Sequence, residues 1–151
     1  MAKKINKQKP KSIITSTLEN KKNISVHNNS TKGNFKVSFA HLDNTQKFGS
    51  GYKDWQKEGL LSKMFETLQG YCCSPLLEQI DGTKFTKYGD FPPKEVNEFD
   101  YPSHVPEDAC WARIHITGPA ILAGHVVEDT FYVVFLDKTH KFYKTRRARE
   151  N

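Results

Sequence analysis

Three strand-like segments near the end of the chain constrain the fold more than any other feature of the sequence. They span residues 111–117, 121–127 and 130–136, and each is short and rich in β-branched, aromatic or other apolar residues. The turn-forming pairs Gly118-Pro119 and Glu128-Asp129 separate them. Connections this short join antiparallel neighbours, because parallel strands need a crossover of a dozen or more residues. The sequence therefore predicts a three-stranded antiparallel meander.

The length of the first turn decides which side chains meet across this meander. If residues 118–120 form a three-residue loop, Arg113 lies directly opposite His125, on the same face of the sheet. If the loop has two residues, Arg113 pairs with Gly124 and is separated from His125. The sequence leaves both registers open.

A helical segment precedes the meander. Residues 54–71 place apolar side chains at helical spacing and so predict one amphipathic helix. Gly59 lowers helix propensity, so two helices that meet near Glu58-Gly59 are the alternative. Pro75 can start a further short helix that reaches Ile80.

The remaining segments complete an α+β fold, a helical hairpin packed on a small antiparallel sheet. Residues 37–42 predict a first strand, and residues 83–88 predict another. Residues 90–108, between the second of these strands and the meander, contain four prolines and several aromatic side chains. Prolines interrupt strand ladders, so this stretch is predicted to be a long loop whose aromatic residues either pin it to the domain or stack on bases.

Charge is distributed unevenly along the chain. Residues 1–33 carry a charge of +7 and almost no aromatic side chains, which predicts a disordered basic arm. Residues 34–144 are expected to form a single domain, and residues 145–151 a basic tail. Positive ends beside an acidic central part favour contact with a polyanion, although such ends can also serve only for solubility.

Several classes of protein are disfavoured. No apolar run is long enough to span a bilayer, and the N-terminus lacks the apolar core of a secretory signal, so a cytoplasmic protein with no membrane partner is expected. Three cysteines without a CxxC pair indicate neither a disulfide framework nor a zinc site. No phosphate-binding or dinucleotide-binding glycine motif is present, so no cofactor is predicted.

The residues with chemistry concentrate near the C-terminus. Cleavage of RNA without a metal requires a base for the 2′-hydroxyl, a proton donor for the 5′-oxygen and cations for the phosphate. The candidate catalytic residues are Arg113, His125, His140 and Tyr143. Six further basic side chains are candidates for substrate binding: His115, Lys138, Lys141, Lys144, Arg146 and Arg147.

Simpler roles remain open for the same residues. A histidine on a strand is more often a hydrogen-bonded structural residue, and Arg113 could pair with Glu128 or Asp129. A metal site formed by His115 and His125 with Asp137 or His140 would match no standard ligand spacing.

The order of a strand, helices and a meander with a histidine- and tyrosine-containing end resembles the RelE/ParE toxin superfamily. The resemblance covers residues 37–143, and most of it lies in WARIHITGPAILAGHVVEDTFYVVFLDKTHKFY. It implies an mRNA-cleaving toxin that acts on translating ribosomes and is neutralised by an antitoxin protein. It also implies that Arg113 and Lys141 stabilise the phosphate, that His140 acts as acid or base, that Tyr143 orients or stacks, and that His125 supports them.

Two alternatives to the ribonuclease stay open. One is a non-catalytic inhibitor, as in the gyrase-directed branch of that superfamily. The other is a nucleic-acid- or protein-binding module in which the basic arm supplies most of the affinity.

Overall fold

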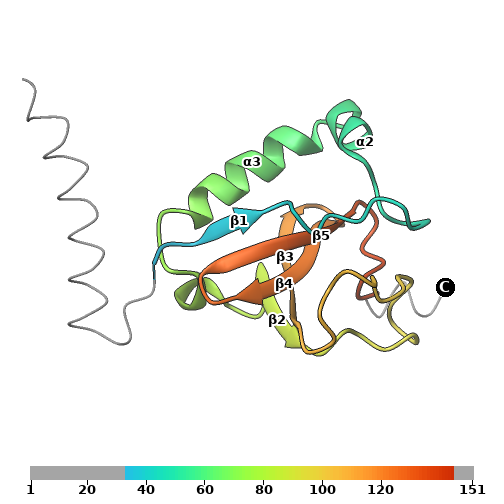
Figure 1. The fold of residues 1–151 in the computed structure, drawn as a ribbon. Coiled ribbons are helices and arrows are strands. Elements are labelled where there is room, and N and C mark those ends of the chain that lie inside the picture. Colours follow the sequence, from blue (N-terminus) through green and yellow to red (C-terminus); the bar gives the residue numbers. More distant parts are fainter. Residues whose placement is uncertain (1–32, 145–151) are drawn as a thin grey trace, which may run out of the picture. The chain divides into compact units, whose positions relative to one another are not determined.

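The computed structural model describes residues 33–144, which form an α+β domain (Figure 1). Its elements, in chain order, are β1 (Lys36–Ser38), α2 (Tyr52–Lys57), α3 (Leu60–Tyr71), the 3₁₀ helix η1 (Leu76–Gln79), β2 (Phe85–Gly89), β3 (Cys110–Thr117), β4 (Ala120–Val127) and β5 (Thr130–Asp137). The predicted arm up to residue 32 and the predicted tail from residue 145 lie outside the described residues. Within residues 33–144, no helix has the length and apolar character needed to cross a membrane.

The five strands form one sheet in the order β1-β5-β4-β3-β2. The pairs β2–β3, β3–β4 and β4–β5 are antiparallel, which confirms the predicted meander. β1 pairs with β5 in parallel, a long-range pairing that the sequence did not indicate. β1 is also shorter than the strand expected over 37–42, because the chain turns where the Leu42 N–H bonds to the Phe39 carbonyl.

Two separate helices replace the single helix expected over 54–71, as the alternative at Gly59 predicted. Gly59 has a φ of +71°, a left-handed conformation that interrupts the helix and that glycine adopts without steric cost. α2 begins at Tyr52, where the Asp54 carboxylate accepts a hydrogen bond from the Gly51 N–H.

β4 and β5 are buried over most of their length because both faces of the sheet are covered. On one face, helix residues such as Trp55, Met64 and Leu68 pack against side chains of β3 and β4. On the other face, residues from the segments 90–109 and 138–144 pack against β3, β4 and β5. The helices and the segment after β2 therefore lie on opposite sides of the sheet (Figure 1).

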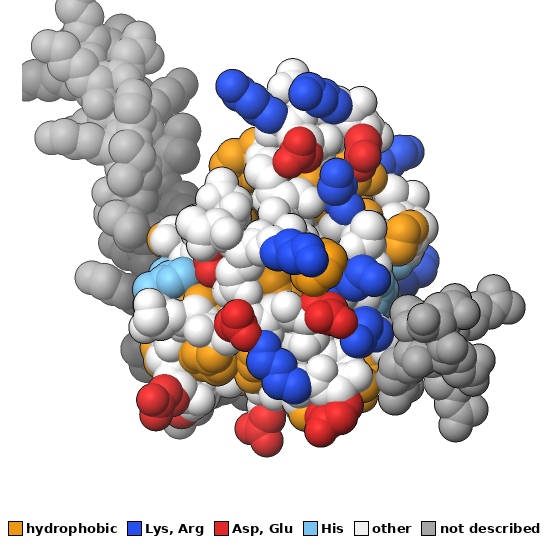
Figure 2. Space-filling model, turned by 90° about the vertical axis from the view of Figure 1, so that its right-hand side faces the viewer, with side chains coloured by type: hydrophobic (Ala, Val, Ile, Leu, Met, Phe, Trp, Pro, Cys, Tyr) orange, Lys and Arg blue, Asp and Glu red, His pale blue; other side chains and the backbone are white. Residues whose placement is uncertain are grey.

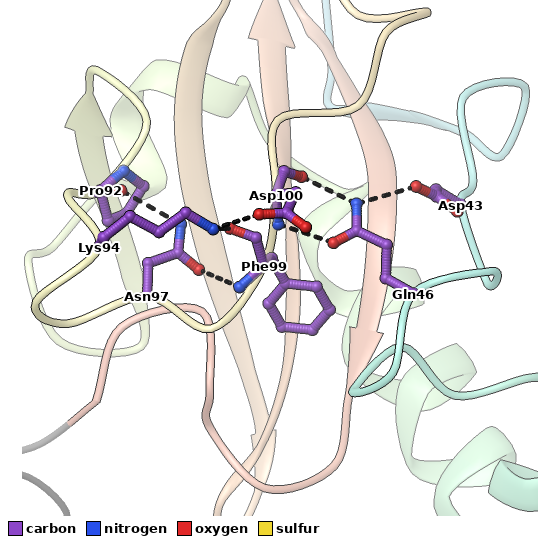
Figure 3. Close-up of polar contacts among 7 residues, drawn as sticks. All are labelled: Asp43, Gln46, Pro92, Lys94, Asn97, Phe99 and Asp100. Carbon is purple, nitrogen blue, oxygen red and sulfur yellow. Dashed lines mark hydrogen bonds and ion pairs between the residues drawn. The ribbon is translucent and has the colours of Figure 1, made fainter.

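The proline-rich segment between β2 and β3 is held by hydrogen bonds as well as by packing (Figure 3). The side chain of Asn97 donates to the Pro92 carbonyl at 3.2 Å and accepts from the Phe99 N–H at 2.9 Å. Gln46 bonds to both the N–H and the carbonyl of Asp100, at 2.7 and 2.8 Å. The Phe99 ring stacks on that of Phe135, with 4.2 Å between centroids. Aromatic residues of this loop thus pin it to the domain, as one of the two sequence interpretations held.

Candidate functional site

The register between β3 and β4 differs from both registers that the sequence left open. Gly118-Pro119 forms a two-residue turn with Thr117 opposite Ala120, but an irregularity at Ile116 shifts the rest of the pairing. Arg113 is therefore opposite Ala123, and His125 is opposite Trp111. Arg113 and His125 share a face of the sheet without being partners.

Arg113 is held by residues of the neighbouring chain segment, not by a carboxylate. Its Nε donates to the Tyr88 hydroxyl at 2.7 Å, and its Nη1 donates to the Thr83 carbonyl at 3.0 Å. Asp129, one of the two carboxylates proposed as its partner, bonds instead to Lys36 at 3.1 Å. A guanidinium has five N–H donors, so these two bonds leave donors for another oxyanion.

Two stacked tyrosine rings extend the site from Arg113. Tyr88 stacks on Tyr143 with 4.9 Å between centroids and an angle of 9° between planes. Tyr143 therefore lies beside the phenol of Tyr88 that holds Arg113. Tyr143 and Arg113 are 30 positions apart in the sequence. Tyr88 ends the strand predicted over 83–88, and no pattern in the sequence marks it as a partner of Arg113. The structure brings the two together because β2 pairs with β3 and Thr86, two residues before Tyr88, lies opposite Arg113.

His140 belongs to the loop that follows β5, and a buried carboxylate organises that loop. Asp137 has no exposed surface and accepts hydrogen bonds from the N–H groups of Lys141 at 3.0 Å and Phe142 at 2.8 Å. His140 lies in the chain between Asp137 and these two N–H groups, and its φ is +59°. Phe142 is also fully buried and packs against Trp111, so the loop conformation is fixed from two sides. Asp137 had been considered only as a possible metal ligand.

The surroundings of His140 favour the neutral form of its imidazole. Burial lowers the pKa of its imidazole, and the positive charge of Arg113 lowers it further, while Asp137 acts in the opposite direction. Burial likewise raises the pKa of the Tyr88 hydroxyl, and Arg113 counteracts this effect. For Asp137, burial raises the pKa, opposed by the backbone N–H groups that it accepts. A neutral imidazole beside a guanidinium can accept a proton near a bound phosphate.

His125 lies in a different cluster. Its Nε2 is 2.9 Å from Nδ1 of His41, and the Tyr132 ring stacks on both imidazoles, with centroids 4.7 Å from His41 and 4.9 Å from His125. The Trp111 ring contacts both His125, with 6.0 Å between centroids, and Phe142 of the His140 loop, with 5.5 Å between centroids. His125 is thus surrounded by rings and makes no hydrogen bond to Arg113 within the described residues. No periodicity in the sequence indicated His41 as its partner.

The other predicted binding residues are dispersed around the His140 loop. Nε2 of His115 is 3.0 Å from the Gly118 carbonyl, within its own hairpin. Lys138 pairs with Glu58 at 3.5 Å, and Lys144 pairs with Glu98 at 2.7 Å.

Lys141 takes part in no ion pair with a described residue, and its ammonium group lies 5.8 Å from the centre of the Phe48 ring. Arg146 and Arg147 lie outside the described residues.

The metal-site alternative does not agree with these positions. His115 bonds to a turn, His125 to another histidine, and Asp137 to backbone N–H groups. Among residues 33–144, no three His, Cys, Asp or Glu side chains converge as ligands.

Comparison with known proteins adds no assignment: no protein-family model, no curated protein and no solved structure matches this chain. Within residues 33–144, Arg113, Tyr88, Tyr143 and His140 are the residues whose arrangement indicates a function.

Proposed function

We propose that the chain is a metal-independent endoribonuclease of the RelE type, with Arg113, His140 and Tyr143 in its active site. The observation that carries this proposal is that the Arg113 guanidinium bonds to one of two stacked phenols, and that the imidazole of His140 has a pKa lowered by burial and by the charge of the same guanidinium. These are the groups that phosphodiester cleavage needs near neutral pH.

Arg113, His140 and Tyr88 each have a role in a cleavage step that uses the 2′-hydroxyl of the substrate, and Tyr143 positions Tyr88 by stacking on it. Neutral His140 takes the proton of this hydroxyl, the 2′-oxygen forms a bond to phosphorus, and the bond from phosphorus to the 5′-oxygen breaks. Arg113 directs its remaining N–H donors to the phosphate oxygens. The Tyr88 hydroxyl accepts from Arg113 and keeps its own proton, so it can protonate the leaving oxygen. The products carry a 2′,3′-cyclic phosphate and a 5′-hydroxyl.

Two parts of the original hypothesis change in this proposal. His125 has no place in the proposed reaction, because its hydrogen-bond partner is His41 and not Arg113. Tyr88 is added as the partner of Arg113. An antitoxin that covers this site remains the protein partner that the resemblance implies, and mRNA on the ribosome remains the implied substrate.

The test expresses the wild-type chain and two variants in a bacterial host and maps RNA ends after induction. His140→Asn removes the acid-base group, and asparagine is among the residues that best tolerate the left-handed conformation at this position. Arg113→Gln removes the charge. Growth arrest with new 5′-hydroxyl ends is expected for the wild type, with a loss of on the order of 100-fold or more in cleavage for His140→Asn.

The matched control is His104→Asn, which removes an exposed histidine from the cluster around His41. It should cleave as the wild type does. Circular dichroism of the purified variants establishes that each is folded. Intact RNA after induction of the wild type would contradict the ribonuclease. Arrest without cleavage, unaffected by either site variant, would instead favour the inhibitor that binds a protein target.

A further inference from the structure

Two lysines from distant parts of the sequence meet at one aromatic ring. Nζ of Lys47 lies 5.2 Å from the centre of the Phe48 ring, and Nζ of Lys141 lies 5.8 Å from the same centre. Lys47 and Phe48 belong to the loop between β1 and α2, whereas Lys141 follows His140 in the loop after β5. The fold thus brings two ammonium groups together that are 94 positions apart in the sequence.

Neither ammonium group forms an ion pair with a carboxylate of the described residues, although Glu98, whose pKa is lowered mainly by its ion pair with Lys144, is also close enough to Lys141 for that charge to lower its pKa further. The ion pairs within residues 33–144 use Lys36, Lys94, Lys138 and Lys144. Each ammonium group contacts the Phe48 ring, and such cation–π contacts add little stability at exposed positions. Two like charges in this arrangement favour a bound anion, because an anion reduces their mutual repulsion.

The ring itself is held in place by the domain. Phe48 is partly buried and packs against the cluster that contains Phe99 and Phe135. The backbone around it is fixed by hydrogen bonds from the Gly49 N–H to the Gln46 carbonyl at 3.0 Å and from the Ser50 N–H to the Leu136 carbonyl at 2.9 Å. Little conformational entropy remains to be lost at this ring when a ligand binds.

We propose that Lys47, Phe48 and Lys141 form a binding surface for a single-stranded nucleic acid. The two ammonium groups contact backbone phosphates, and the uncovered part of the ring stacks on a base. Figure 2 shows the side of the molecule that carries α2 and the loop before it, where lysine and arginine side chains lie among hydrophobic and acidic ones. An aromatic ring that contacts two cations without ion-pair partners among the described residues fits alternating bases and phosphates better than it fits an acidic peptide without aromatic groups.

The surface shares a loop with the candidate active site, since Lys141 directly follows His140 in the chain. This inference rests on the proposed function in one respect only, which is that the bound single-stranded nucleic acid is the RNA substrate. Binding at Lys47, Phe48 and Lys141 does not require cleavage.

The experiment measures binding of the full chain to a fluorescent 12-nucleotide 2′-O-methyl RNA, which lacks the attacking hydroxyl and so separates binding from chemistry. Anisotropy titrations are run between 50 and 300 mM KCl. For Lys47→Gln with Lys141→Gln, the slope of log K against log salt should fall by about 1.4, as expected for two lost phosphate contacts on a single strand. The affinity at 150 mM KCl should fall about tenfold with that slope. Phe48→Leu, which keeps an apolar side chain, should weaken binding about fivefold or more through lost stacking.

The matched control is Lys53→Gln with Lys63→Gln, which removes the same charge from exposed positions on α2 and α3. It should retain most of the affinity. Equal losses in the two double variants would overturn the inference, and so would binding of poly-glutamate but not RNA at Lys47 and Lys141. If no new RNA ends appear in cells but the purified chain still binds RNA through Lys47 and Lys141, the proposed ribonuclease activity is refuted and the binding surface is not.

Discussion

The buried imidazole of His125 ties the stability of this domain to pH. Only 2% of its surface is exposed, and burial is the largest cause that lowers its pKa from 6.5 to about 4. The nearby imidazoles of His41 and His104 lower it further. An unfolded chain releases His125 from this environment, so the unfolded state binds a proton at a higher pH than the folded state. The free energy of unfolding must therefore decrease as the pH falls from about 6.5 to about 4.

The size of this effect follows from the two pKa values. A difference of about 2.5 units corresponds to about 3 kcal/mol of unfolding free energy, since each unit is worth about 1.4 kcal/mol. This loss is large for a domain of about 110 residues, whose total stability is typically about 5–15 kcal/mol.

The perturbation is His125→Phe, which keeps a ring against Tyr132 but removes the titrating group. Urea unfolding is measured at pH 7, 5.5 and 4 for the wild type and the variant. The wild type should lose about 3 kcal/mol more than the variant between the highest and lowest pH. Tyr132→Phe is the control: it retains His125 and the stacked ring and should follow the wild type. A difference between wild type and His125→Phe that does not change with pH would refute the argument that His125 is neutral because it is buried.

Three further substitutions test the packing around the site. Gly124→Ala should lower the free energy of unfolding in urea by about 3 kcal/mol or more. The reason is that the new Cβ would lie 2.0 Å from the Tyr132 carbonyl oxygen, a backbone atom of the adjacent strand. A stability within about 0.5 kcal/mol of wild type would contradict the register between β4 and β5. Phe142→Ala should cost about 3–5 kcal/mol, as expected for a fully buried ring, and a smaller loss would mean that the His140 loop is not anchored there. Asp137→Asn should cost about 1–3 kcal/mol because one backbone N–H loses its acceptor. In an NMR titration of the same variant, the pKa of His140 should fall below that of the wild type, since the charge of Asp137 raises it. An unchanged pKa would show that Asp137 does not influence His140.

Local patterns in the sequence predicted those elements that depend on near neighbours. The alternation in residues 111–117 predicts Ala112 and Ile114 on one face of the strand and Trp111 on the other, and the structure buries the two sets in different cores. Gly59 marked the break between α2 and α3 for an equally local reason, its left-handed backbone. Such features depend on the preferences of one residue and on spacings of two to four residues.

The arrangement of the candidate site did not follow from those patterns. Both registers considered for the meander were wrong because the irregularity at Ile116 shifts Arg113 by one position, and side-chain alternation carries no mark of a bulge. The pairing of Arg113 with Tyr88 depends on where β2 joins the sheet.

The sequence by itself determined the α+β class, the meander and the concentration of basic and imidazole groups near its end. Only the tertiary structure decided that His140 and Tyr143 lie with Arg113 while His125 lies with His41. The physical reason is that side chains meet across strands and loops according to register and packing. Both depend on contacts among residues far apart in the chain, which periodicity within a segment does not encode.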